Sequence, residues 1–99
     1  MKIAINTEYG TFSLSDVAMQ EIIKRKGVAF IYGEDFHPGF DKYRTDTDLI
    51  AVIEELGWQA WGFGAHIEIV EIPDGIEYEI FERSGSELVM EIGHFWGGK

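Results

Sequence analysis

The second half of the chain, from Ala65 to Ile92, alternates hydrophobic and polar residues in three runs of strand length. Alternating residues place apolar side chains on one face of a strand and polar side chains on the other. Only Pro73-Asp74-Gly75 and Ser84-Gly85-Ser86 separate the runs, and both segments consist of turn-forming residues. This pattern predicts a compact antiparallel β-meander.

One face of the meander is expected to be apolar and the other acidic. The apolar face on the last two runs is predicted to comprise Ile76, Tyr78, Ile80, Leu88, Met90 and Ile92. Carboxylates that face one another repel when they are buried, so the opposite face is expected to be a solvated sheet surface. It is predicted to carry Glu68, Glu71, Glu77, Glu79 and Glu91.

The first half of the chain predicts two more strands. Residues 2–6 alternate as a strand does, and residues 28–32 form a continuous apolar run, typical of a strand covered on both faces. Residues 33–43 form the longest irregular segment, which is either a binding loop or a variable surface excursion.

Two helices are predicted between these strands. Ser13 opens an S-x-x-D capping box, and the helix that follows is expected to end at Gly27. Residues 45–48 supply hydroxyl and carboxylate caps for a second helix, which either stops at Gly57 or continues more loosely to Gly62. The chain is therefore predicted to be a single α+β domain, residues 1–99, of order β-α-β-α-β-β-β.

Composition agrees with a folded domain and limits its chemistry. The chain is 45% hydrophobic, which is too apolar for disorder, and it has no cysteine for a disulfide or a thiolate metal site. The N-terminal residues turn polar at Asn6, far short of a secretory signal or a membrane span. These features favour a cytoplasmic protein without membrane contact.

The net charge of −10 is unevenly distributed along the sequence. Residues 1–45 hold six basic and six acidic side chains, whereas residues 46–99 hold two basic and twelve acidic ones. Duplex nucleic acid is therefore not an expected partner, because its phosphates would be repelled. A cluster of cations is expected to form a local positive patch for a small anionic ligand. Its members are Lys24, Arg25, Lys26, Lys42 and Arg44.

Enzyme motifs are not found in the sequence. His37, His66 and His94 match no metal-ligand spacing, and no nucleophile elbow, Walker loop or dinucleotide-binding glycine motif occurs. The expectation is a protein without catalytic residues, metal or cofactor. Trp58, Trp61 and Phe63 crowd the end of the second predicted helix, where they complete a core, support self-association or form a stacking platform.

Several segments of the chain carry a resemblance to a known group of proteins. They are Lys2–Asn6, Tyr9–Ser15, Arg44–Leu49, Val52–Gly57 and Val70–Asp74, and the likeness continues to His94 and Trp96. Through them the chain resembles a group of small uncharacterised proteins of phages and their bacterial hosts. The resemblance covers most of the chain and implies a phage setting, a host-cell cytoplasm and a shared fold, without an established activity.

Two binding functions suit a small phage protein without catalytic motifs. The first is a sponge that sequesters a nucleotide immune signal of the cyclic ADP-ribose or cyclic dinucleotide class. Such a ligand needs a cation for its phosphates and flat rings for its bases. Arg44, near the start of the second helix, is the candidate phosphate ligand. The candidate stacking residues are Tyr9, Phe12, Phe36, Trp58 and Trp61.

The second binding function is a decoy, in which the acidic sheet face takes the place of nucleic-acid phosphates on a host protein. A purely structural or virion-associated role is a third interpretation. The number of rings in so short a chain, with Phe95 and Trp96 near its glycine-rich end, also predicts a homo-oligomer.

Overall fold

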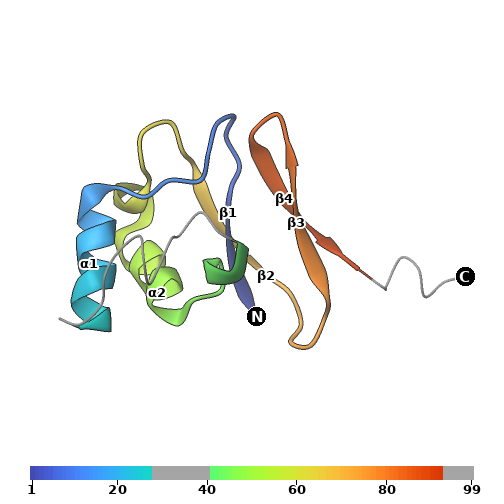
Figure 1. Ribbon diagram of the computed structural model, residues 1–99, viewed down its shortest axis with the longest axis horizontal. Helices are drawn as coiled ribbons and strands as arrows, with labels where there is room; N and C mark the ends of the chain where they lie inside the picture. Colours follow the sequence, from blue (N-terminus) through green and yellow to red (C-terminus); the bar gives the residue numbers. More distant parts are fainter. Residues whose placement is uncertain (28–40, 93–99) are drawn as a thin grey trace, which may run out of the picture.

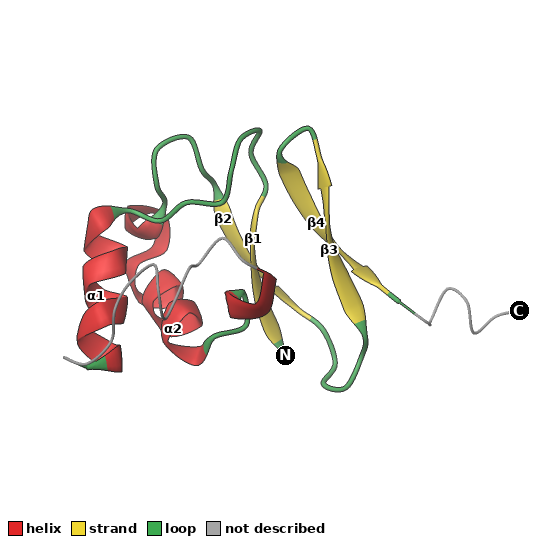
Figure 2. Ribbon diagram, viewed as in Figure 1, coloured by secondary structure: helices red, strands yellow, loops and turns green. Residues whose placement is uncertain are grey.

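The computed structural model describes residues 1–27 and 41–92. The helices lie at one end, a pair of strands lies in the middle and a hairpin lies at the other end (Figures 1 and 2). The elements are β1 (Lys2–Asn6), α1 (Asp16–Lys26), α2 (Thr47–Leu56), β2 (Ile67–Glu71), β3 (Tyr78–Arg83) and β4 (Ser86–Glu91). The α+β class is confirmed, and the described elements follow one another as predicted, apart from the second strand of the predicted order. The strand predicted at residues 28–32 lies outside the described residues.

β1 and β2 form an antiparallel pair, with Lys2 opposite Glu71 and Asn6 opposite Ile67. All of β1 except Lys2 is buried, which indicates that the strand is covered on both faces. The meander pairing predicted for the last three strands is confirmed for β3 and β4, whereas β2 takes β1 as its partner.

Helix α1 begins two residues later than the sequence predicts. Its N-cap is Ser15, whose hydroxyl accepts a hydrogen bond from the Ala18 N–H at 3.2 Å. Ser13, the predicted cap, is engaged elsewhere, because its carbonyl accepts a hydrogen bond from the Gly62 N–H at 2.9 Å. A Cβ atom added at Gly62 would lie 2.3 Å from the Ser13 hydroxyl oxygen. Ser13 therefore packs against Gly62 in the segment before β2, and Ser15 is the residue that caps the helix.

Helix α2 is capped by one of the predicted residues 45–48 and takes the earlier of the two ends that the sequence leaves open. The Asp46 carboxylate accepts a hydrogen bond from the Leu49 N–H at 3.0 Å, as an N-cap residue does. Gly57 ends the helix with a φ of 59°, which residues with a Cβ rarely adopt. The chain then continues as a 3₁₀ helix, Gly57–Ala60, and a second 3₁₀ helix, Asp41–Tyr43, precedes α2.

The hydrophobic core lies between the two helices and the β1–β2 pair. Its buried members are Ala4, Phe12, Leu14, Ala18, Ile22, Leu49, Ile50, Val52, Ile53, Ala60, Ala65 and Ile67. Within the described ranges, no side chain of β3 or β4 belongs to this cluster. The hairpin is therefore attached to the rest of the molecule, here called the body, by other contacts.

A two-residue turn, Ser84-Gly85, joins β3 to β4. Both residues have positive φ, 55° and 87°, the combination that a type I′ hairpin turn requires. Ser86 already belongs to β4, where it lies opposite Arg83. The turn predicted from the sequence, Ser84-Gly85-Ser86, is one residue too long.

The shorter turn places the β4 side chains in a register that the sequence pattern does not reveal. Val89 lies opposite Ile80, and Leu88 lies opposite Phe81. The prediction that Leu88 and Met90 continue the apolar face of Ile80 is therefore wrong. They lie on the other face, so the hairpin carries apolar residues on both faces.

Candidate functional site

A buried ion pair between Arg44 and Glu87 connects the body to the hairpin. The guanidinium donates to both carboxylate oxygens, at 2.7 Å and 2.9 Å, in a bidentate arrangement that is among the stronger polar contacts. The two side chains are only 3% and 11% exposed. The guanidinium carbon also lies 3.9 Å from the centre of the Phe12 ring, close enough for a cation–π contact.

This geometry gives Arg44 and Phe12 structural roles that the sequence did not predict. Arg44 was predicted to bind a ligand phosphate, but its charge is compensated by a carboxylate of the same chain. Phe12 was predicted to stack on a base, but its ring is buried beneath the guanidinium. Both residues contribute to the junction between body and hairpin.

The same ion pair covers the edge of β1 that β2 leaves open. Arg44 Nη1 donates to the Ala4 carbonyl at 3.2 Å, and the Ala4 N–H donates to the Arg44 carbonyl at 2.9 Å. The Asn6 N–H donates to Glu87 Oε1 at 2.8 Å. In a continuous sheet these backbone groups would pair with a neighbouring strand. Here Arg44 and the Glu87 carboxylate take the place of that strand.

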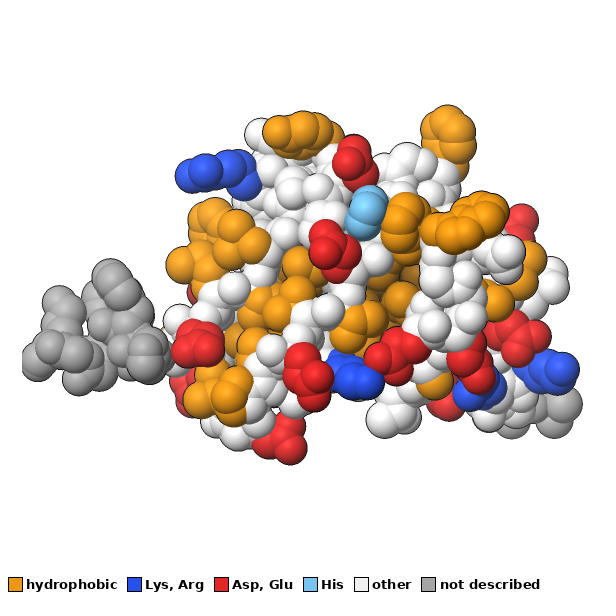
Figure 3. Space-filling model, turned by 180° about the vertical axis from the view of Figure 1, so that it is seen from behind, with side chains coloured by type: hydrophobic (Ala, Val, Ile, Leu, Met, Phe, Trp, Pro, Cys, Tyr) orange, Lys and Arg blue, Asp and Glu red, His pale blue; other side chains and the backbone are white. Residues whose placement is uncertain are grey.

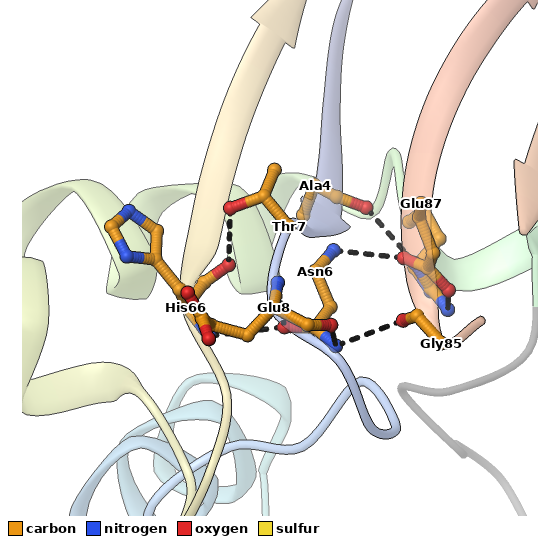
Figure 4. Close-up of polar contacts among 8 residues, drawn as sticks. Ala4, Asn6, Thr7, Glu8, His66, Gly85 and Glu87 are labelled. Atoms are coloured by element: carbon orange, nitrogen blue, oxygen red, sulfur yellow. Dashed lines mark hydrogen bonds and ion pairs between the residues drawn. The ribbon is translucent and has the colours of Figure 1, made fainter. Parts of the chain in front are cut away.

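Asn6 is fully buried and links three segments through its side-chain amide (Figure 4). Its nitrogen donates to the carbonyls of Glu8, at 3.0 Å, and Gly85, at 3.4 Å. Its oxygen accepts from the N–H groups of His66, at 3.0 Å, and Glu8, at 3.3 Å. Because all of these bonds are made within the chain, Asn6 has a structural role.

The hairpin turn packs directly against the loop that follows β1. A Cβ atom added at Gly85 would lie 2.3 Å from the Gly10 nitrogen and 2.6 Å from the Gly10 oxygen. Ser86 Oγ donates to the Thr7 carbonyl at 3.0 Å. The turn and the loop are thus in backbone contact, and no side chain fits between them.

Four of the five predicted stacking residues lie in the described part of the chain, and their rings have different environments. Tyr9 and Trp58 are 77% and 70% exposed, so both rings are accessible. Trp61 is half-buried and stacks on His66, with ring centres 4.1 Å apart and an angle of 29° between the planes. Phe36 lies outside the described residues.

The three aromatic residues near the end of α2 do not share one role: one belongs to the core and two are exposed. Trp61 packs against the core cluster, as a core residue does. Trp58 is largely exposed and Phe63 is fully exposed, so neither completes the core. These two rings remain available for a partner or a flat ligand.

A cavity of about 590 Å³ lies beside the N-terminus and α2. It is lined by Met1, Lys2, Thr45, Thr47, Ile50, Ala51, Glu54, Asp74 and Gly75, which include none of the predicted ligand-binding residues. Lys2 Nζ lies 2.7 Å from a Glu54 oxygen, and the Met1 ammonium lies 2.7 Å from an Asp74 oxygen. The hydrogen bond that Lys2 donates to Glu54 raises the pKa of Lys2, and the hydrogen bond that Asp74 accepts from the Met1 ammonium lowers the pKa of Asp74.

The predicted positive patch is largely compensated by acidic side chains. Lys26 Nζ contacts Asp46 at 2.8 Å and Asp48 at 3.1 Å, which ties the end of α1 to the start of α2. Burial acts to lower the pKa of Lys26, but its hydrogen bonds to these carboxylates outweigh burial and the pKa is raised. Arg25 pairs with Glu55 in the same way.

Apart from Glu87, the carboxylates on and next to the strands face solvent, as the sequence predicts for all of those that follow except Glu82. Glu68, Glu71, Glu77, Glu79, Glu82 and Glu91 are all exposed. They do not share one sheet face, because β2 belongs to a different pair from β3 and β4. On the side of the molecule seen in Figure 3, acidic side chains extend across the whole width, with hydrophobic side chains between them.

The structure offers no geometry for metal chemistry among residues 1–27 and 41–92, where no group of potential ligands is close enough to hold an ion. His66 stacks on Trp61, while His37 and His94 lie outside the described residues. No helix in those ranges has the length and apolarity needed to cross a bilayer.

Sequence reasoning missed Asn6 and Glu87, which organise the junction between body and hairpin. Asn6 was read as the end of a strand, and Glu87 resembles the other glutamates around it. Neither position carries a local signal, because their partners are up to 81 residues away in the chain.

Comparison with known proteins adds no family assignment, since no protein family model, no curated protein and no solved structure matches this chain.

Proposed function

We propose that the chain is a non-catalytic phage-type protein that binds the cationic surface of a host nucleic-acid-binding protein. The observation that carries this proposal is the distribution of compensated and uncompensated charge. Lys2, Arg25, Lys26 and Arg44 each contact a carboxylate of the same chain. The exposed carboxylates of the strand region make no ion pair within the described ranges. These strand-region carboxylates are Glu68, Glu71, Glu77, Glu79, Glu82 and Glu91.

Such a charge distribution suits a decoy for nucleic acid. The excess negative charge attracts a basic surface over long range, and this attraction weakens as salt screens it. The strand backbone arranges these carboxylates before binding, so that a partner orders only their side-chain rotamers. The phage setting and the host cytoplasm as the place of action are part of this proposal and follow from the resemblance inferred from the sequence.

The experiment that tests the decoy begins with capture of host proteins on the immobilised chain, followed by purification of the captured protein. Binding is then measured with increasing salt and with duplex DNA as a competitor. The proposal requires that salt weakens the complex and that DNA and the chain exclude one another. A captured protein that binds DNA and the chain simultaneously would contradict it.

Matched variants separate local from overall charge. Glu68→Gln with Glu71→Gln removes two negative charges from β2, and Gln20→Lys with Gln59→Lys adds two positive charges at exposed positions elsewhere. Both double variants change the net charge equally. The β2 variant is expected to weaken binding about tenfold and the control by much less. Equal losses would show that no particular surface is recognised.

A nucleotide sponge is the second candidate, favoured by the size of the cavity beside α2. Its volume of about 590 Å³ is in the usual range for small-molecule sites, and Lys2 and the Met1 ammonium stand at it. Isothermal titration with a panel of cyclic nucleotides tests this function. Ala51→Trp fills the cavity, whereas Trp58→Ala leaves it unchanged. If the first variant abolishes nucleotide binding and the second retains it, the protein is a sponge that binds through the cavity. Absence of heat with every nucleotide excludes it.

A further inference from the structure

One face of the hairpin is apolar, electrically neutral and half-exposed. This outer hairpin face consists of Glu79, Phe81 and Arg83 on β3 and Ser86, Leu88 and Met90 on β4. Phe81, Leu88 and Met90 are 48%, 44% and 47% exposed. On a chain with a net charge of −10, this face carries one acidic and one basic residue.

The opposite, inner face of the hairpin is directed at the body. It carries Glu87, which reaches Arg44, and the half-buried pair of Ile80 and Val89. A two-stranded hairpin is marginally stable unless its hydrophobic residues pack against something. Within the described part of the chain, the outer face is left with its apolar side chains partly in solvent. Apolar patches of this kind mark contact surfaces.

The charges on the outer face are arranged so that the face is complementary to itself. Glu79 and Arg83 lie two residues before and two residues after Phe81 on the same face of β3. They are about 13 Å apart along the strand, too far to pair with one another. A two-fold axis that crosses the strands at Phe81 would place Glu79 of one copy against Arg83 of the other. The same axis would bring the two Phe81 rings together and the two Leu88 side chains together.

We propose that a second copy of this chain packs on the outer hairpin face, forming a two-fold symmetric dimer. Two hairpins stacked face to face bury Phe81, Leu88 and Met90 of both copies between them, at the usual separation of packed sheets. Each Glu79 then meets an Arg83, so the interface contains two equivalent ion pairs. The remaining acidic side chains stay outside the contact. This dimer does not depend on the decoy or the sponge function.

The charge arrangement gives the dimer a specific test by light scattering and sedimentation. The wild type is expected to have twice the mass of the chain at micromolar concentration. Arg83→Glu and Glu79→Arg each place like charges in contact twice and are expected to raise the dissociation constant about tenfold or more. Combining Glu79→Arg with Arg83→Glu restores opposite charges and is expected to restore the dimer. A monomeric wild type, or failure of the double variant to recover, would overturn the proposal.

A second pair of variants tests whether the faces or the edges of the hairpins meet. Leu88→Ser lies on β4 and is expected to weaken a face-to-face dimer about tenfold or more. Val17→Ser is the control, because Val17 is a similarly exposed aliphatic residue on α1. If Leu88→Ser dimerises as tightly as the control, the outer hairpin face is not the interface. Circular dichroism confirms that each variant remains folded.

Discussion

Arg44 and Glu87, 43 residues apart in the chain, form the bidentate ion pair that attaches the hairpin to β1. A buried ion pair adds little net stability compared with apolar residues, because both charges lose their hydration. It is, however, demanding in geometry, since two parallel hydrogen bonds form in only one orientation. The pair therefore fixes where β4 lies relative to β1.

Replacing Glu87 with Gln should destabilise the protein by about 3 kcal/mol, because it leaves the buried Arg44 charge without its carboxylate. Urea unfolding followed by circular dichroism measures the change. Glu82→Gln is the matched control, since Glu82 lies directly opposite Glu87 in the hairpin but is exposed. The control should change stability by about 0.5 kcal/mol or less. If both variants lose the same stability, loss of the ion pair does not explain the effect of Glu87→Gln.

The combination of Arg44→Met with Glu87→Leu should be less destabilising than either single change. Each single change leaves one buried polar group without its partner, whereas the double change leaves neither charge. A double-mutant cycle from urea unfolding is expected to give a coupling energy of about 2 kcal/mol or more. Additive effects would mean that the two side chains act independently, contrary to the contact described.

Gly85→Ala should destabilise the protein by about 3 kcal/mol, because a methyl group there would meet the Gly10 backbone and would also require a positive φ. Gly75→Ala provides the control, since its φ of 84° is nearly the same and its Cβ would meet no atom within 4 Å. That variant isolates the cost of the backbone conformation, about 1 kcal/mol. Thermal unfolding of both variants separates the two contributions. Similar losses of stability in Gly85→Ala and Gly75→Ala would contradict a tight contact between the hairpin turn and the loop that follows β1.

The raised pKa of Lys26 predicts a loss of stability in alkaline solution. A lysine whose pKa is higher in the folded state contributes stability below its unfolded pKa, about 10.4, and loses that contribution as the pH rises through the folded value. Lys26→Met should therefore be less stable than the wild type near pH 8, with a difference that narrows above about pH 10. Urea unfolding across this range measures the difference. A difference that is constant with pH would rule out this linkage.

The parts of the fold that depend on neighbouring residues were predictable from the sequence. Asp46 and Gly57 bound α2 because a carboxylate cap and a glycine end act within a few residues. Alternation correctly identified β3, because Tyr78 and Ile80 point to its more buried face. The helix start at Ser15 was missed because the contact of Ser13 with Gly62 comes from a distant segment.

The parts that depend on distant contacts were not predictable in the same way. Alternation identifies β2 but does not identify β1 as its partner, and a turn shorter by one residue reverses the faces of Leu88 and Val89. The candidate site was the least predictable part, because the sequence around Arg44 does not distinguish a buried arginine from an exposed one. Its burial depends on Glu87 and Phe12, neither of which is near it in the chain.

The junction also has a consequence for the order of events on the ribosome. Nascent chains emerge N-terminus first, and domains begin to fold during synthesis. Ala4, Phe12 and Ile67, which anchor the core, are translated before Glu87. Until that codon is read, the Arg44 guanidinium in a nascent body lacks the bidentate contact with Glu87. Completion of the hairpin is thus the step that supplies the carboxylate of this buried ion pair.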